Sequence, residues 1–91
     1  MRLAATSFGS AHAEVSRVSE RRYRIDAYGG GCEFAHELVD FDGRVEIISI
    51  GFEGAFESEE SERDVYAARS AAIEQARAAD PAFAAMLAEA P

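Results

Sequence analysis

Residues 34–52 read FAHELVDFDGRVEIISIGF, and the Asp42-Gly43 pair inside this stretch is the clearest structural signal of the sequence. An Asp-Gly pair readily takes up the positive φ angles that a two-residue hairpin turn requires. Runs rich in apolar residues flank the pair on both sides. We therefore predict a β-hairpin whose strands are formed by residues 34–41 and 44–52.

Both faces of this hairpin mix apolar and acidic side chains, which leaves a second interpretation open. Phe34, Leu38 and Phe41 also fall at the i, i+4 and i+7 spacing of a helix. Residues 32–41 could therefore form a helix instead of a strand. In the hairpin, the pairs predicted across the strands are Leu38–Ile47, Phe34–Gly51, Val39–Glu46 and Glu37–Ile48.

Upstream of the hairpin, the sequence indicates further strands. Residues 22–28 alternate between apolar and polar with a period of two, which is typical of a half-buried strand. The three glycines at 29–31 then form a turn, because they lack the lysine and the spacing of a phosphate-binding loop. Residues 2–8 and 12–19 are predicted as two more short strands, with a helical turn or two over 11–20 as the alternative.

Downstream of the hairpin, the chain becomes helical in character. From residue 58 onward, 12 of 34 residues are alanine, and apolar residues recur at helical spacing from Val65 to Ala76. Residues 61–64, with the sequence SERD, match a capping box at the start of this helix. The Asp80-Pro81 pair is typical of a cap followed by the first residue of a second, short helix.

Strands first and helices last predict one α+β domain over residues 1–91, mainly β over 1–57 and helical over 58–90. We expect an antiparallel sheet of about four strands to pack on the alanine-rich helix, with the short terminal helix covering an edge or reaching a partner. The chain has 91 residues, of which 19 are alanine and none is tryptophan, so its core must be small. A homodimer interface could supplement such a core.

The strongest functional clue is the distribution of charge. Ten carboxylates and a single arginine lie between Glu33 and Glu62, which gives this third of the chain a formal charge of −9, while the whole chain carries −8. Self-repulsion on this scale opposes folding unless the charges face water or a basic partner. We therefore expect a protein partner with a basic surface.

No arrangement of residues typical of catalysis or of metal binding is visible. His12 and His36 lack the spacing of metal ligands, and no serine lies in a GxSxG motif. Cys32 is the only cysteine, which excludes an intrachain disulfide and fits a reducing cytoplasm. We expect no catalytic residue, no metal and no cofactor.

Two other kinds of partner are also not expected. No apolar run reaches the length that spans a membrane. Arg21, Arg22 and Arg24 lie outside any nucleic-acid-binding motif, so direct nucleic-acid binding is not expected. These arginines are expected to pair with the acidic hairpin or to neutralise the adjacent face of the sheet.

The best candidate for a contact surface is the segment over residues 51–62, GFEGAFESEESE, where two phenylalanines lie among acids. Such a segment can present aromatic anchors inside a rim of carboxylates, spaced much as phosphates are, to a groove that normally holds nucleic acid. The structural alternative is that both phenylalanines enter the core and the glutamates match the helix dipole. The predicted partner-binding residues are Phe52, Glu53, Phe56, Glu57, Glu59, Glu60, Glu62 and Asp64. Glu37, Asp40, Asp42 and Glu46 are predicted as a secondary acidic face, with the solvated side of the hairpin as the alternative.

In its small size, its acidity and its lack of catalytic motifs, with residues 33–62 carrying the likeness, the chain resembles anti-CRISPR proteins of phages and prophages. The resemblance implies a non-enzymatic inhibitor that blocks nucleic-acid binding by its target, and it assigns no individual residue. A second hypothesis is an immunity protein or antitoxin that neutralises a nuclease. A hypothesis of another class is a dimeric α+β domain, small-molecule-binding or enzymatic, with a pocket lined by Tyr23, Tyr28, Cys32 and His36.

Overall fold

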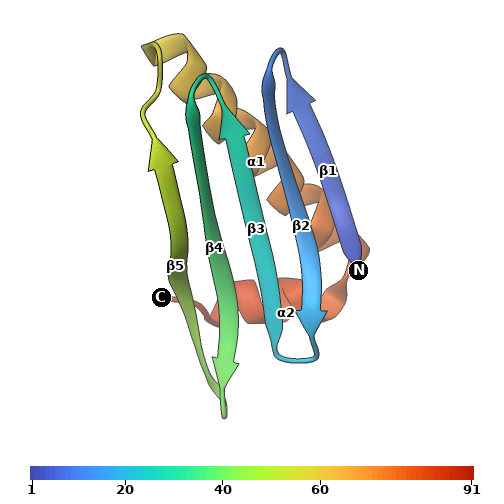
Figure 1. Ribbon diagram of the computed structural model, residues 1–91. Coiled ribbons are helices and arrows are strands. Elements are labelled where there is room, and N and C mark those ends of the chain that lie inside the picture. Colours follow the sequence, from blue (N-terminus) through green and yellow to red (C-terminus); the bar gives the residue numbers. More distant parts are fainter.

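The computed structural model describes residues 1–91 and shows five antiparallel strands followed by two helices (Figure 1). Each strand pairs with the next along the chain, so the sheet order is β1-β2-β3-β4-β5. The predicted α+β class is confirmed, with five strands instead of about four. The strands are β1 (Arg2–Phe8), β2 (Ala11–Ser19), β3 (Arg22–Gly29), β4 (Cys32–Phe41) and β5 (Arg44–Gly54), and the helices are α1 (Glu59–Ala79) and α2 (Pro81–Glu89).

Two-residue turns connect the strands, as the sequence predicts for the central hairpin. Asp42 and Gly43 have φ angles of 54° and 96°, which are the positive values that this turn requires. Gly30 and Gly31 form the turn between β3 and β4 in the same way, with φ angles of 54° and 85°. The helical alternatives for residues 32–41 and 11–20 are wrong, because both segments lie in strands.

The register of the central hairpin agrees with the prediction near the turn and departs from it further away. Phe34 pairs with Phe52 rather than with Gly51, because Ile50 has no partner on β4. Such a β-bulge adds one residue to β5 and shifts every later pair by one. The predicted pairs Leu38–Ile47, Val39–Glu46 and Glu37–Ile48 are confirmed.

The two helices cover only one side of the sheet (Figure 1). Helix α1 packs on β1, β2 and β3, whereas α2 packs against α1 and reaches β4 and β5. The other side, which we call the open face, carries no helix. The fully buried side chains of the core are Val15, Tyr23, Ile25, Leu38, Val65, Ala68, Ala72, Ala76 and Phe83.

Helix α1 begins three residues earlier than the capping box at residues 61–64 predicts. Its N-cap is Ser58, whose hydroxyl accepts a hydrogen bond from the backbone N–H of Ser61 at 3.1 Å. The N–H of Glu57 donates to the carbonyl of Gly30 at 2.8 Å and so fixes the chain just ahead of the cap. The segment between β5 and α1 is therefore held against the β3–β4 turn, and α1 starts directly after this contact. Ser61 itself lies in the first turn, against Gly30.

Helix α2 begins as the sequence predicts. Asp80 is its N-cap and accepts hydrogen bonds from the N–H groups of Ala82 at 2.9 Å and Phe83 at 3.3 Å. The hydroxyl of the buried Tyr23 also donates to Asp80 at 3.1 Å. These bonds hold the pKa of Asp80 below its usual value, although desolvation acts in the opposite direction. No helix of the chain is both long and apolar enough to cross a membrane.

Candidate interaction surface

An aromatic cluster forms where β5 leaves the sheet and α1 begins. Its centre is the buried ring of Phe34, which stacks on Phe52 with 6.0 Å between ring centroids. Tyr66 from α1 lies 5.4 Å from Phe34, and Phe56 lies 6.4 Å from it and 6.1 Å from Tyr66. The bulge in β5 makes this cluster possible, since it places Phe52 rather than Gly51 beside Phe34.

Much of this apolar surface is exposed because neither helix covers the far end of β5. Phe52 is 63% exposed and Tyr66 is 46% exposed, and Ile47 and Ile50 on the same strand are also exposed. Phe56 is half-buried and packs against the core. The alternative in which both phenylalanines enter the core therefore holds for Phe56 but not for Phe52.

Tyr66, Ile47 and Ile50 were missed by the sequence reasoning. Tyr66 follows the buried Val65 by one position, which turns it away from the sheet-facing stripe of α1 toward β4. In the sequence, the signal that could have identified Tyr66 as a surface residue is a single large aromatic side chain in an otherwise alanine-rich helix. The two isoleucines are typical strand residues, and only the position of β5 at the sheet edge makes them conspicuous.

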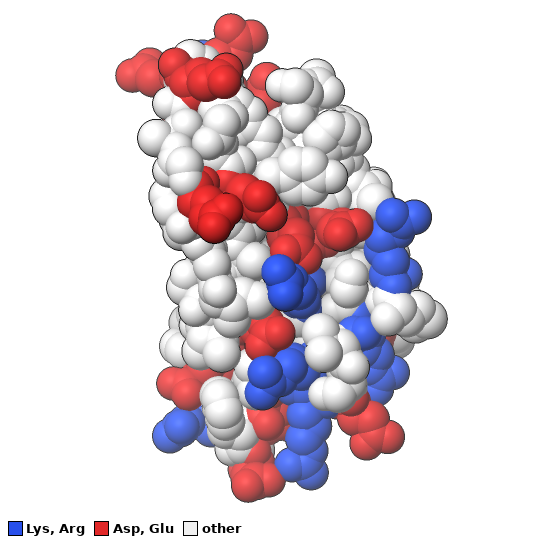
Figure 2. Space-filling model, viewed as in Figure 1, with Lys and Arg blue, Asp and Glu red and all other residues white.

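Carboxylates border this apolar surface and have no partners within the chain. Glu53, Glu57, Glu59 and Glu60 are exposed, and none of them takes part in any of the six ion pairs of the molecule. Figure 2 shows a group of acidic side chains at the end of the molecule where α1 begins, whereas most arginines in this view lie lower, among further acidic side chains. We call the combination the β5–α1 surface, made of Ile47, Ile50, Phe52, Glu53, Phe56, Glu57, Glu59, Glu60, Glu62 and Tyr66. Asp64, also predicted here, is half-buried in the second turn of α1.

The four acids of the predicted secondary face do not lie on one face. Alternation along β4 puts Glu37 on the open face and Asp40 on the side of the helices, while Asp42 occupies the turn. Asp40 accepts a hydrogen bond from the N–H of Gly43 at 2.6 Å. Glu37 is only 8% exposed, so the interpretation of these acids as the solvated side of the hairpin is wrong for Glu37. Glu46 joins Glu37 on the open face, on β5.

The arginines pair with the acidic hairpin and with the sheet face, as expected. Arg22 donates to Glu37 at 2.8 Å, and Arg21 donates to Asp42 at 2.8 Å. Arg24 bonds to its neighbour Asp26 on the open face at 2.9 Å. The carboxylates near the β4–β5 turn therefore have partners, in contrast to those of the β5–α1 surface.

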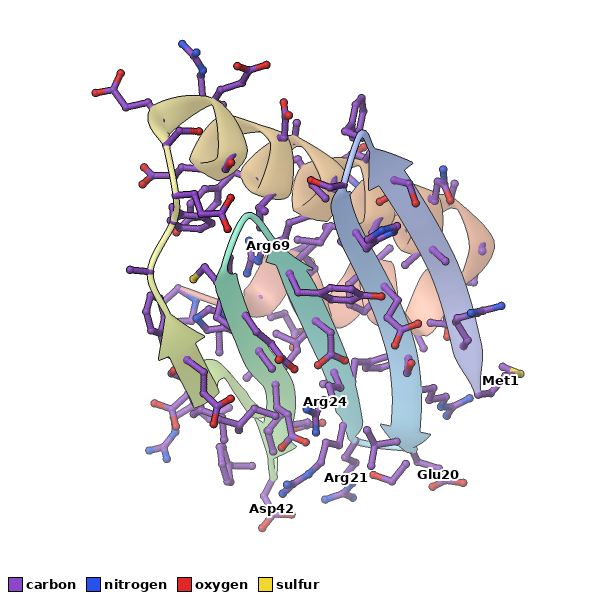
Figure 3. All side chains as sticks on the ribbon, turned by 45° about the horizontal axis from the view of Figure 1, so that its top comes forward. Met1, Glu20, Arg21, Arg24, Asp42 and Arg69 are labelled. Atoms are coloured by element: carbon purple, nitrogen blue, oxygen red, sulfur yellow. The ribbon has the colours of Figure 1, made fainter.

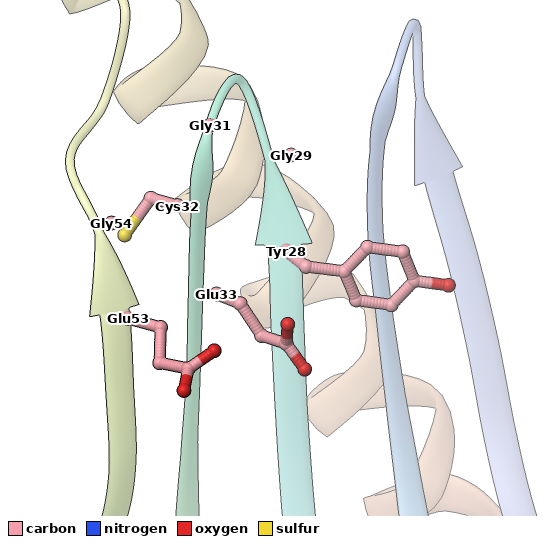
Figure 4. Close-up of a pocket in the computed structure, with 7 residues that line it drawn as sticks. All are labelled: Tyr28, Gly29, Gly31, Cys32, Glu33, Glu53 and Gly54. Atoms are coloured by element: carbon pink, nitrogen blue, oxygen red, sulfur yellow. The ribbon is translucent and has the colours of Figure 1, made fainter.

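The open face carries a shallow hollow beside the end of β5, with a volume of about 390 Å³ (Figure 4). Glu33 and Glu53 lie directly opposite each other on β4 and β5 at its rim. Like charges in this position destabilise a sheet. Glu33 was not among the predicted site residues, and it extends the unpaired acidic region around the sheet edge onto the open face.

Behind the aromatic cluster, α1 and β4 enclose two polar side chains without hydrogen-bond partners. The Nδ1 atom of His36 and the Nε atom of Arg69 are both buried and unpaired. Burial lowers the pKa of His36, and the positive charge of Arg69 lowers it further. Burial also lowers the pKa of Arg69. Figure 3 shows Arg69 pointing from α1 toward the sheet.

Of the side chains predicted to line the alternative pocket, only Tyr28 and Cys32 lie together, at the hollow on the open face. Tyr23 and Cys32 are buried in the core, whereas Tyr28 stacks on His12 on the open face with 5.2 Å between ring centroids. His36 lies on the other side of the sheet, next to Phe34. No three His, Cys, Asp or Glu side chains come together in a way that could hold a metal ion. Comparison with known proteins finds no matching family model, no similar curated protein and no similar solved structure.

Proposed function

We propose that the protein is a non-enzymatic interaction protein whose β5–α1 surface binds a basic, nucleic-acid-handling protein, as anti-CRISPR-type inhibitors do. One observation carries this proposal: exposed aromatic and aliphatic side chains coincide with exposed carboxylates that have no partner in the chain. Aromatic anchors inside a polar rim are the usual composition of a protein-binding surface. The unpaired carboxylates set the sign of the partner's charge.

In this proposal the glutamates take the place of phosphates in a groove lined by arginine and lysine. Long-range attraction between the surfaces accelerates association and makes it sensitive to salt. Phe52 and Tyr66 then bury their rings against the partner and slow dissociation. A groove occupied in this way no longer binds nucleic acid. We place the protein in the cytoplasm, where the free thiol of Cys32 stays reduced.

The test is affinity purification of the tagged protein from a lysate of its source organism. One variant carries Gln at Glu53, Glu57, Glu59 and Glu60. A matched control removes the same number of charges elsewhere, through Glu20→Gln, Asp42→Asn, Glu74→Gln and Glu89→Gln, all of which are exposed positions. We expect the wild type and the control to capture the same basic partner and the first variant to lose it. Binding should also fail above about 0.5 M salt, where screening acts within a few ångströms.

Two results would overturn the proposal. The first is equal recovery of the partner by both variants, since the β5–α1 carboxylates would then be irrelevant. The second is a captured partner that has no basic nucleic-acid-binding surface. Capture of a nuclease would instead identify the protein as an immunity protein or antitoxin that uses the same surface.

A further inference from the structure

Arg69 differs from the other eight arginines of the chain. Six of them form ion pairs with carboxylates. Arg17 lies 5.9 Å from the centre of the Tyr23 ring, and Arg63 is exposed to solvent. Arg69 is half-buried, forms no ion pair, and has a buried Nε without a hydrogen-bond partner. Arg69 is thus the one arginine of the chain with a buried nitrogen that has no hydrogen-bond partner.

The position of Arg69 follows from the way in which α1 and β4 run. Both elements start at the β3–β4 turn, where the Glu57 N–H bonds to the Gly30 carbonyl and fixes the start of α1. Tyr66 lies over Phe34 near that turn. Arg69 is about 4.5 Å further along the helix, and His36 is about 6.6 Å further along the strand. Helix α1 crosses behind the sheet toward β1, and the guanidinium of Arg69 remains near enough to His36 to add to the effect of burial in lowering the pKa of the histidine.

No carboxylate of the chain forms an ion pair with Arg69. His36 cannot supply a negative charge in either protonation state, and burial and the neighbouring guanidinium lower its pKa. The unpaired glutamates on α1 lie in its first turn, Glu59, Glu60 and Glu62. Partial burial of a guanidinium without a counter-charge is unfavourable. A methionine could make the same apolar contacts as the aliphatic part of the Arg69 side chain. Packing alone therefore does not explain why this position carries an arginine.

We propose that Arg69 binds a carboxylate that the protein partner supplies, from an Asp or Glu side chain inserted beside Tyr66. This inference rests on the proposed function, since it describes one feature of the partner's surface. Arginine binds carboxylates through two parallel N–H···O bonds, and these bonds strengthen when water is excluded. The partner must then present one acid among its basic residues. Such a requirement separates the correct partner from other polycations, which would place a positive charge against Arg69.

The test uses the full chain labelled with ¹⁵N and sodium acetate as the probe. The Nε–Hε signal of Arg69 is followed by NMR together with the ring signals of His36, and sodium chloride at equal ionic strength is the reference titration. Arg63 is the internal control, because it lies on the same helix, is exposed and also lacks an ion pair. We expect acetate, but not chloride, to move the Arg69 signal downfield and to shift the His36 ring, with a smaller response at Arg63.

Variants separate binding from packing. Arg69→Lys keeps the charge and the stem but lacks the planar fork, so the His36 response to acetate should weaken. Arg69→Gln should abolish it, whereas Arg63→Gln should leave it unchanged. An Arg69 signal that responds no more to acetate than to chloride would overturn the inference, and so would an unchanged His36 response in Arg69→Gln. Acetate binding does not involve the partner, so this result is independent of the success of the affinity purification.

Discussion

The acids near the β4–β5 turn and those of the β5–α1 surface belong to one acidic block of the sequence, yet their surroundings are opposite. Glu37, Asp42 and Glu46 each pair with an arginine. Glu53 and Glu57 pair with none, and Glu53 lies opposite another glutamate. Arginines of β3, of the β2–β3 turn and of β5 itself reach these three acids, whereas no arginine pairs with the acids at the far end of β5 and just ahead of α1. The acidic segment over residues 33–62 therefore contains two kinds of carboxylate: those paired with arginines of the chain, and those free to bind a partner.

The largest expected effect comes from breaking the contact that holds the β5–α1 surface in place. A Cβ atom at Gly30 would lie 2.3 Å from the Cβ of Ser61, at a φ of 54°. For Gly30→Ala we expect a loss of about 2–4 kcal/mol in the free energy of unfolding, from overpacking together with left-handed strain. Urea denaturation followed by circular dichroism measures this loss.

Two controls identify the cause. Gly43 also has a positive φ, but nothing lies within 4 Å of a Cβ there, so Gly43→Ala should cost only the backbone strain of about 1–2 kcal/mol. Adding Ser61→Gly to Gly30→Ala should recover the part that is due to overpacking. Equal losses for the two glycine variants would show that the close approach to α1 does not matter.

The second expected effect concerns Asp80, the acid with the most hydrogen bonds in the chain. Asp80→Ala removes the N-cap of α2 and leaves the buried Tyr23 hydroxyl without its acceptor. We expect a loss of about 2–3 kcal/mol from these two causes together. Asp80→Asn keeps a capping oxygen, so its loss at pH 7 should be smaller, about 1 kcal/mol.

The same pair of variants predicts how stability depends on pH. The pKa of Asp80 is lower in the folded protein than in the unfolded chain. The carboxylate therefore stabilises the fold fully above the unfolded value of about 3.9, and this contribution is lost as the pH falls through the lower folded pKa. Thermal unfolding between about pH 2 and 6 should show a steeper acid decline for the wild type than for Asp80→Asn. Parallel curves would contradict this assignment.

Local signals predicted most of the fold. The Asp42-Gly43 turn, the strands and the Asp80-Pro81 helix start all rest on neighbouring residues, and all are confirmed. The bulge at Ile50 could not be predicted, because it depends on how β5 meets β4. The same holds for the start of α1 at Ser58, which a hydrogen bond between Glu57 and the distant Gly30 fixes.

The candidate site could be predicted only in part, for a similar reason. Phe52 and the nearby glutamates were found because they follow one another in the sequence. Tyr66, Arg69 and Glu33 were not, because each joins the region through tertiary contacts. The sequence also could not distinguish acids with partners from acids without them, since the arginine that pairs with Glu37 is 15 residues away.

The smallest expected effect tests directly whether acids of the hairpin and acids of the β5–α1 surface differ. It uses two single Glu→Gln substitutions. Glu37→Gln removes the charge of a buried carboxylate from a part-buried hydrogen bond with Arg22. Bonds to charged groups are stronger than neutral ones, so we expect a loss of about 1 kcal/mol. Glu53→Gln removes one of two like charges that face each other across β4 and β5. We expect it to stabilise the fold by about 0.3 kcal/mol at low salt.

Salt distinguishes the two carboxylates further. The gain from Glu53→Gln comes from repulsion between exposed charges, so it should disappear in urea denaturation at 1 M sodium chloride, where the screening length is about 3 Å. The loss from Glu37→Gln should decrease less, because Glu37 is buried even though Arg22 is partly exposed. If Glu53→Gln instead destabilised the fold at both salt concentrations, Glu53 would be a structural residue. The carboxylates of the β5–α1 surface would then no longer differ from those of the hairpin, and the reason to regard them as available for a partner would be lost.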